Sequence, residues 1–203
     1  DLIGNAPSGS GKTGAFLLPA FARLLDGPQK LRALVLTPTR EHAAQVEAHA
    51  RDYARFTELR VALSHNAAPI AVQERVLRDP GVDVLIATVD RLLELHARKA
   101  IDFDDVEILV LDEADRMVDV GQAGDIRKLL KLLPETRQTL LFSATMPAEL
   151  NRLAKEALIE PVRVDLTVPQ PAAGITHAIY PVPNYLKIEL LDRLLSRSGE
   201  VRS

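Results

Sequence analysis

A small-residue loop near the start of the chain carries a lysine followed by a threonine, as phosphate-binding loops do. Residues 6–13 read APSGSGKT, with a strand-like apolar pair before them and a helix-like apolar pattern after them. Gly9 and Gly11 allow the backbone to turn its N–H groups around phosphate oxygens, and the following helix N-terminus adds partial positive charge. Lys12 can reach the β- and γ-phosphates of a nucleotide, and the Thr13 hydroxyl can ligate Mg²⁺. The alternative is a flexible turn with a surface lysine, which the flanking patterns disfavour. The predicted nucleotide-binding residues are Ala6, Ser8, Gly9, Ser10, Gly11, Lys12 and Thr13.

A pair of acidic residues stands at the end of an apolar run over 106–111. In parallel α/β sheets, ligands lie at the carboxyl ends of the strands, so Asp112 would project toward a metal held by Thr13. Glu113 is next along the chain and suits orienting or deprotonating an attacking water. Alone, this segment fits a solvated acidic turn equally well. Together with the phosphate loop, the catalytic interpretation is favoured.

Strand-length apolar runs that alternate with helix-period segments would bring these residues together. The predicted strands are 33–36, 60–63, 84–87, 106–111 and 139–142, and the predicted helices include 40–53 and the segment around Leu92, Leu93 and Leu95. The strand residues are apolar at consecutive positions rather than at every second one, which indicates burial on both faces. This alternation predicts an α/β fold with a mainly parallel sheet and helices on both faces.

Composition narrows the class of protein. The 203 residues suffice for one well-cored domain and a short piece of a second. The net charge of -3 argues against a dedicated non-specific nucleic-acid binder, and the 4% of aromatic residues, without tryptophan, argues against a surface that stacks bases. The absence of cysteine excludes disulfides and thiolate metal sites and fits a reducing cytoplasm. No apolar run approaches membrane-spanning length, so we expect no membrane partner.

Further motifs follow the phosphate loop in a fixed order. Residues 38–41 read PTRE, Thr88 and Arg91 come next, residues 112–115 read DEAD and residues 143–145 read SAT. Together with the loop, these motifs resemble the N-terminal domain of the DEAD-box RNA helicases over nearly all of residues 1–165. Alanine at the first loop position, here Ala6, is usual in that family.

The resemblance implies a RecA-like P-loop fold, ATP with Mg²⁺ as the nucleotide, and RNA as the polymer. It implies that Lys12, Asp112 and Glu113 serve catalysis, with Glu113 as the catalytic base, and that Thr13 and, through water, Asp112 hold the metal. The residues that couple the ATP state to RNA would be Asp115, Ser143 and Thr145, and the RNA-binding residues would be Pro38, Thr39, Arg40, Thr88 and Arg91. Without the resemblance, Ser143 and Thr145 fit helix caps, and Arg40 fits a surface charge at a helix start.

The departures from the family pattern fall on the RNA-facing motifs. Residues 89–90 are Val-Asp where the family usually has Pro-Gly, and the stretch 64–68 lies where it usually has a glycine pair. Glycine matters there because RNA phosphates approach the backbone closely, and Asp90 adds negative charge. In addition, His42 replaces a usual leucine and Gln122 stands where an aromatic residue is common. Our hypothesis is that the protein binds RNA weakly or unusually.

Three segments are expected along the chain. They are an N-terminal RecA-like ATP-binding domain over 1–166, a proline-containing linker over 167–174, and the opening segment of a second RecA-like domain over 175–203. In the last segment, a strand is predicted over 175–182 and a helix over 187–195. The family places an adenine-reading segment before the phosphate loop and arginine fingers in the second domain, so we expect the protein to continue on both sides.

The resulting hypothesis is a fragment of an ATP-dependent RNA helicase, an RNA-dependent ATPase that binds ATP-Mg²⁺ and single-stranded RNA. Hydrolysis and local duplex unwinding would need the second domain, so this fragment alone should be nearly inactive. Two alternatives stay open. One is a DNA helicase or translocase on the same fold, although motifs 38–41 and 143–145 favour RNA. The other is a non-catalytic nucleotide-gated clamp, which the changes at 66–68 and 89–90 motivate.

Overall fold

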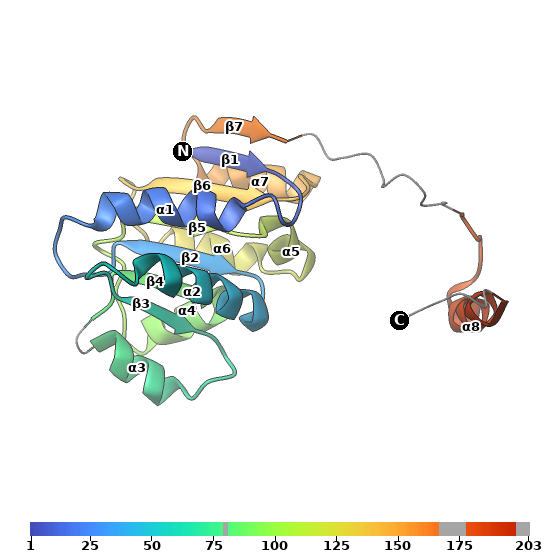
Figure 1. The fold of residues 1–203 in the computed structure, drawn as a ribbon, viewed down its shortest axis with the longest axis horizontal. Coiled ribbons are helices and arrows are strands. Elements are labelled where there is room, and N and C mark those ends of the chain that lie inside the picture. Colours follow the sequence, from blue (N-terminus) through green and yellow to red (C-terminus); the bar gives the residue numbers. More distant parts are fainter. Residues whose placement is uncertain (79–80, 167–177, 198–203) are drawn as a thin grey trace. The chain divides into compact units, whose positions relative to one another are not determined.

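Seven parallel strands form one sheet among the residues that the structure, a computed structural model, describes: 1–78, 81–166 and 178–197. The strands are β1 (Leu2–Asn5), β2 (Ala33–Thr37), β3 (Val61–Ser64), β4 (Val84–Thr88), β5 (Ile108–Leu111), β6 (Gln138–Ser143) and β7 (Val162–Asp165). Their order across the sheet is β3-β4-β2-β5-β6-β1-β7 (Figure 1). The chain divides into two compact units, residues 1–168 and 169–203, and the sheet lies in the first.

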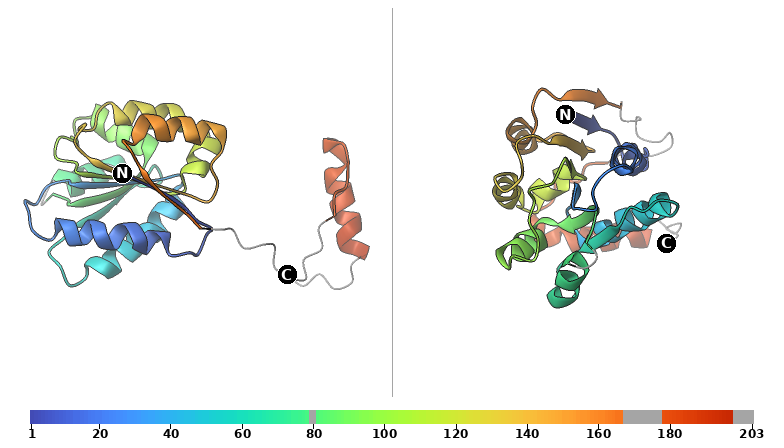
Figure 2. Two further views of the ribbon diagram at one scale, coloured as in Figure 1. Left: turned by 90° about the horizontal axis from the view of Figure 1, so that it is seen from above. Right: turned by 90° about the vertical axis from the view of Figure 1, so that its left-hand side faces the viewer.

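Helices cover both faces of the sheet (Figure 2). The helices on one face are α1 (Lys12–Leu24) and α2 (Arg40–Ala54), those on the other are α4 (Val89–Ala97), α5 (Ala114–Asp119), α6 (Ala123–Leu130) and α7 (Ala148–Ala157), and α3 (Ile70–Arg78) follows the edge strand β3. Within β2, Val35 packs under α1 and α2, whereas Leu34 and Leu36 belong to the core on the opposite face. Consecutive apolar residues therefore serve opposite cores, and the predicted α/β fold is confirmed.

The carboxyl ends of the strands all lie at one edge of the sheet, because every pair is parallel. Asn5 of β1 is level with Ser143 of β6, and Thr37 of β2 is level with Thr88 of β4. The phosphate loop, the SAT motif and the DEAD motif therefore follow the adjacent strands β1, β6 and β5. The PTRE motif and the other RNA-facing segments follow β2, β4 and β3.

The strands predicted at 33–36, 60–63, 84–87, 106–111 and 139–142 are present, with shifts of one or two residues at their ends. The edge strand β7 was not predicted. Its four residues are all exposed and alternate between valine and a charged residue, so it lacks the consecutive apolar residues by which the buried strands were found.

In the second unit, the described residues 178–197 form a 3-10 turn, η1 (Asn184–Leu186), and helix α8 (Lys187–Arg197). The helix predicted over 187–195 is present. The strand predicted over 175–182 is wrong for residues 178–182, none of which lies in a strand. Pro181 and Pro183 lack the N–H that a ladder requires. Residues 175–177 and the predicted linker 167–174 lie outside the described residues. No helix of the described segments is long and apolar enough to cross a bilayer.

Candidate nucleotide-binding and catalytic site

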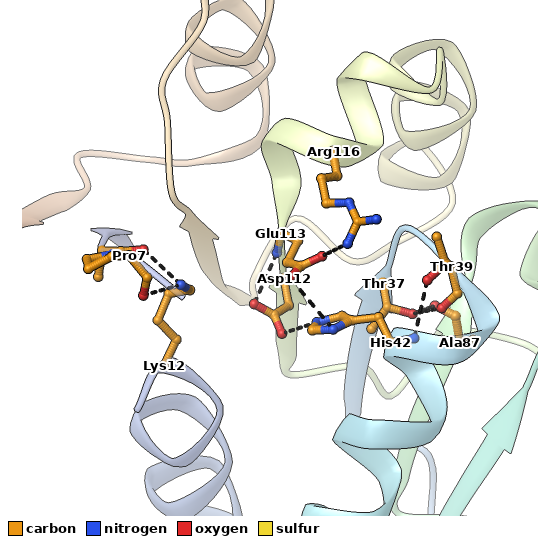
Figure 3. A network of polar contacts seen from close by, with 10 residues as sticks. Pro7, Lys12, Thr37, Thr39, His42, Ala87, Asp112, Glu113 and Arg116 are labelled. Atoms are coloured by element: carbon orange, nitrogen blue, oxygen red, sulfur yellow. Dashed lines mark hydrogen bonds and ion pairs between the residues drawn. The ribbon is translucent and has the colours of Figure 1, made fainter. Parts of the chain in front are cut away.

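The phosphate loop is held in a turned conformation by two glycines and by its own lysine. Gly9 (φ 77°) and Gly11 (φ 89°) both adopt left-handed backbone angles, which L side chains rarely adopt. A Cβ added at either position would meet nothing within 4 Å, so the backbone angle rather than crowding explains both glycines. The ammonium of Lys12 donates to the carbonyl oxygens of Ala6 (2.8 Å) and Pro7 (2.9 Å) and thereby bridges the loop (Figure 3).

The acidic turn begins directly where β5 ends. Asp112 is buried, and its Oδ1 accepts a hydrogen bond from the N–H of Glu113 at 3.0 Å. Glu113 has a left-handed backbone (φ 52°), which is uncommon for a residue with a side chain. Its carboxylate accepts from the guanidinium of Arg116 at 2.9 Å. The turn therefore fixes both carboxylates at the carboxyl edge of the sheet.

His42 in the first turn of α2 contacts this acidic pair (Figure 3). Its Nε2 lies 2.8 Å from Oδ2 of Asp112, and its Nδ1 lies 3.8 Å from Oε1 of Glu113. Burial lowers the pKa of His42, but the hydrogen bond to Asp112 and the negative charges of Asp112 and Glu113 outweigh burial, so that the pKa lies above its ordinary value. The sequence marked His42 only as a departure from a family pattern. Its contact with Asp112 depends on the packing of α2 beside the end of β5.

The three predicted coupling residues lie together where β5 and β6 end. Oδ2 of Asp115 accepts from the N–H (3.0 Å) and the hydroxyl (2.9 Å) of Thr145, and the Ser143 hydroxyl donates to the Thr145 carbonyl at 2.5 Å. Burial raises the pKa of Asp115, but hydrogen bonds from the Thr145 hydroxyl and N–H and from the Arg116 N–H outweigh burial and lower the pKa below its ordinary value. Neither Ser143 nor Thr145 caps α7, because that helix begins at Ala148 with Pro147 at its N-cap.

The phosphate loop, α2 and the acidic turn line one cavity of about 380 Å³. Ser8, Lys12, Thr13, Asp112 and Glu113 are among its lining residues. A larger cavity of about 720 Å³ is lined by residues at the amino ends of strands, such as Asp1 and Thr139, and by none of the predicted site residues. The smaller cavity is therefore the one that the predicted phosphate-binding and catalytic residues line.

The residues around the smaller cavity fit a nucleotide that brings its own metal. Among the described residues, no group of three or more histidine, aspartate or glutamate side chains could hold a metal ion by itself. Mg²⁺ in phosphate-transfer sites takes only one or two protein groups and completes its shell with phosphates and water. Thr13 and Asp112, both on the wall of this cavity, supply a hydroxyl and a carboxylate of that kind. The donor set therefore suits Mg²⁺ bound together with phosphates.

The PTRE segment at the end of β2 lies along another cavity, of about 390 Å³. Pro38, Thr39, Arg40 and Thr88 help to line it. Thr39 caps α2, because its hydroxyl accepts from the N–H of His42 at 3.2 Å. Arg40 is the first residue of α2, is exposed and pairs with Glu41 at 2.6 Å. Its position agrees with the alternative of a surface charge at a helix start. The same exposure leaves the Arg40 side chain accessible to RNA.

Two residues that depart from the family pattern, Asn66 and Asp90, are connected by a hydrogen bond on the wall of the cavity along the PTRE segment. The side-chain amide of Asn66 donates to the carboxylate of Asp90. Arg91, which is buried, donates from Nε to the Asn66 side-chain oxygen at 3.0 Å and from a terminal nitrogen to the Asn66 carbonyl at 3.1 Å. Asn66 and Asp90 both line the cavity. They place a carboxylate and an amide where the family resemblance predicts glycine.

Comparisons with known proteins agree with these motifs. A family model described as "DEAD/DEAH box helicase" matches residues 1–153. The chain is 43% identical over 170 residues to DEAD-box ATP-dependent RNA helicase 28 of Oryza sativa subsp. japonica, an alignment that covers 81% of this chain and 21% of the relative. It is 44% identical over 179 residues to ATP-dependent RNA helicase drs1 of Neurospora crassa, covering 86% of this chain and 21% of the relative. The chain thus spans about a fifth of the length of these relatives.

A solved structure also resembles the fold. The crystal structure of a hypothetical ATP-dependent RNA helicase from Sulfolobus tokodaii matches with a TM-score of 0.74 and 34% identity, over 82% of this chain and 48% of that one. This match bears out the RecA-like fold that the motifs predicted.

Proposed function

The chain belongs to the DEAD/DEAH box helicase family, and we propose that it is the ATP-binding half of an ATP-dependent RNA helicase. The observation that carries the proposal is that the phosphate loop and the Asp112–Glu113 turn line the same cavity. A phosphate-binding lysine, a metal-binding hydroxyl and two carboxylates then converge on one space, as hydrolysis of a γ-phosphate requires.

Each residue has a defined part in this proposal. Lys12 would leave the carbonyls of its own loop to bind the β- and γ-phosphates, and Thr13 and Asp112 would hold Mg²⁺, Asp112 through water. When bound, Mg²⁺ supplies positive charge that stabilises the charge developing on the phosphate oxygens. Glu113 orients the attacking water and accepts its proton. The Asp115–Thr145 contact passes the state of the nucleotide site to the rest of the carboxyl edge.

The domain organisation follows from the same proposal. Residues 1–166 form the N-terminal RecA-like domain, 167–174 are a linker, and 175–203 open a second RecA-like domain. That second domain would supply the arginine finger, a group that contributes about 10³–10⁵-fold to phosphoryl-transfer rates. RNA binding in the 38–41 and 88–91 region, together with the second domain, would bend the strand and melt short duplexes.

The test is ATP hydrolysis with and without single-stranded RNA, measured on this chain and on a longer form that carries a second RecA-like domain. We expect only the longer form to hydrolyse ATP at an appreciable rate, and we expect RNA to accelerate that hydrolysis. Hydrolysis by the short chain at the rate of the longer form would contradict the proposal that the second domain is needed for hydrolysis. A longer form that binds no ATP would sink the proposal itself.

The Asn66–Asp90 hydrogen bond favours a second candidate, a nucleotide-gated clamp with weakened RNA coupling. A carboxylate beside the 38–41 segment repels phosphates. Two further hydrogen bonds, from Arg91 to Asn66, keep the Arg91 guanidinium occupied within the protein. The longer form would then bind ATP without hydrolysis that single-stranded RNA accelerates. RNA-stimulated hydrolysis would exclude this candidate.

A further inference from the structure

His42 stands where the RNA-facing half of the carboxyl edge meets the nucleotide-facing half. It follows the 38–41 segment at the end of β2, in the first turn of α2. β2 and β5 are neighbours, with Leu36 level with Leu111, and the N–H of Asp112 donates to the Leu36 carbonyl at 3.0 Å. The first turn of α2 is therefore fixed relative to the start of the acidic turn.

The imidazole of His42 completes the set of bonds that hold the Asp112 carboxylate (Figure 3). Oδ1 of Asp112 accepts from the backbone N–H of Glu113 at 3.0 Å, and Oδ2 lies 2.8 Å from Nε2 of His42. With one donor on each oxygen, rotation of the carboxylate about its χ2 angle would break at least one bond. The ring is largely enclosed, with 15% of its side chain exposed, so that water does not readily replace it.

The second nitrogen of His42 faces the other acidic residue. Nδ1 lies 3.8 Å from Oε1 of Glu113, which is too long for a direct hydrogen bond but close enough for an electrostatic contact. One side chain from the PTRE end of α2 thus touches both carboxylates of the nucleotide site. A leucine at this position would have no donor to offer either of them.

We propose that His42 is a positioning residue of the hydrolytic site, which orients the Asp112 carboxylate for metal-bound water and ties it to the 38–41 segment. The inference rests on the proposed function, because it assigns Asp112 to the metal. Partners that orient a metal-binding group change metal affinity by about 10–100-fold when they are removed. Because Asp112 acts through water, the effect of losing His42 belongs at the lower end, about tenfold.

The first experiment observes the bond without any nucleotide. In the ¹⁵N-labelled chain, nitrogen-proton NMR of the histidine rings should find a proton on Nε2 of His42 that exchanges slowly with water. Asp112→Asn should shift that signal and speed its exchange, while the signals of His96, on α4 and away from this cavity, stay in place. A His42 ring proton that exchanges freely and ignores Asp112→Asn would overturn the proposal.

The second experiment measures the Mg²⁺ concentration needed for binding of a fluorescent ADP, N-methylanthraniloyl-ADP. His42→Leu should raise that concentration about tenfold. His42→Gln, whose amide can donate to Asp112 from a similar place, should keep the Mg²⁺ concentration close to that of the wild type. His96→Leu makes the same substitution on α4, where the ring stacks on Phe103 and does not line this cavity, and should leave the Mg²⁺ requirement as in the wild type. Far-ultraviolet circular dichroism reports whether each variant is folded.

Two negative results would be distinguishable. If the wild type binds the fluorescent ADP with Mg²⁺ and His42→Leu has the same Mg²⁺ requirement, the role of His42 is wrong and the proposed function stands. If the wild type binds no nucleotide at all, the proposed function fails, and the positioning role fails with it.

Discussion

Asp115 binds Thr145 through a single carboxylate oxygen that accepts two hydrogen bonds, one from the backbone N–H at 3.0 Å and one from the hydroxyl at 2.9 Å. The other oxygen of Asp115 accepts from the N–H of Arg116 at 3.1 Å. Asp115 follows β5 and Thr145 follows β6, so the contact joins the ends of two neighbouring strands. The contact therefore ties the DEAD turn to the SAT turn.

Replacing Asp115 by asparagine should destabilise the fold. The amide offers one acceptor where the carboxylate has two, so either the Thr145 or the Arg116 N–H loses its partner. Hydrogen bonds to charged groups are worth about 1.5–3 kcal/mol, so we expect the free energy of unfolding in urea to fall by about 2 kcal/mol. Asp119→Asn, an exposed position on the same helix, should change it by no more than about 0.5 kcal/mol. Equal effects of the two substitutions would show that the contact contributes nothing specific.

The contribution of Asp115 should disappear in acid. Its native pKa lies below the ordinary value, so the stabilisation is fully present above the unfolded pKa of about 3.9 and is lost as the pH falls through the lower native pKa. The difference in unfolding free energy between wild type and Asp115→Asn should therefore be constant above about pH 5 and shrink below about pH 4. Urea titrations at a series of pH values measure this difference. A difference that grows on acidification would contradict the assigned direction of the pKa shift.

Much of the fold could be predicted from the sequence, because each buried strand of this sheet needs apolar residues on both faces. Consecutive apolar runs such as 33–36 and 84–87 are typical of such strands, and they located β2 and β4. The position of the site at one edge of the sheet follows in turn, since parallel strands must end together. The exposed strand β7 carries no such pattern, and it was missed.

Contacts between motifs could not be predicted in the same way. The bond between His42 and Asp112 joins residues 70 positions apart and depends on β2 and β5 being neighbours, which no local pattern specifies. The Asn66–Asp90 bond likewise depends on the adjacency of β3 and β4. The sequence marked three of these residues, His42, Asn66 and Asp90, as unusual, but only the sheet order assigns them partners.

Lys12→Ala should weaken nucleotide binding far more than it weakens the fold. The Lys12 ammonium bridges two carbonyls of its own loop, an arrangement that water can replace, whereas its proposed bonds to phosphates join opposite charges. We expect the affinity for N-methylanthraniloyl-ADP with Mg²⁺ to fall by about 2 kcal/mol, or roughly thirtyfold. Lys131→Ala, an exposed position beside the cavity at the amino ends of the strands, is the matched control and should bind as the wild type does. Unchanged binding by Lys12→Ala would place the nucleotide elsewhere.

Asp90→Asn should strengthen RNA binding, since it removes a negative charge from the wall of the cavity along the PTRE segment while keeping the size of the side chain. One unit charge about 4 Å from another in water is worth about 1 kcal/mol, so the affinity for single-stranded RNA should rise about fivefold. The measurement is fluorescence anisotropy of labelled RNA with the longer form of the chain, at one fixed salt concentration because phosphate binding depends steeply on salt. Asp105→Asn removes the same charge where Asp105 pairs with Lys30, before β5 begins, and should have no effect.

The wild-type affinity in the same titration separates the two proposed functions. Micromolar or tighter binding by the wild type, unchanged in Asp90→Asn, would mean that phosphates pass clear of Asp90, and the helicase proposal would then need no weakened RNA coupling. Weak wild-type binding that Asp90→Asn restores, together with RNA-stimulated hydrolysis only in the variant, would instead identify the Asn66–Asp90 bond as the feature that makes this chain a nucleotide-gated clamp. The bond would then set RNA affinity through one carboxylate, without any change in the nucleotide site.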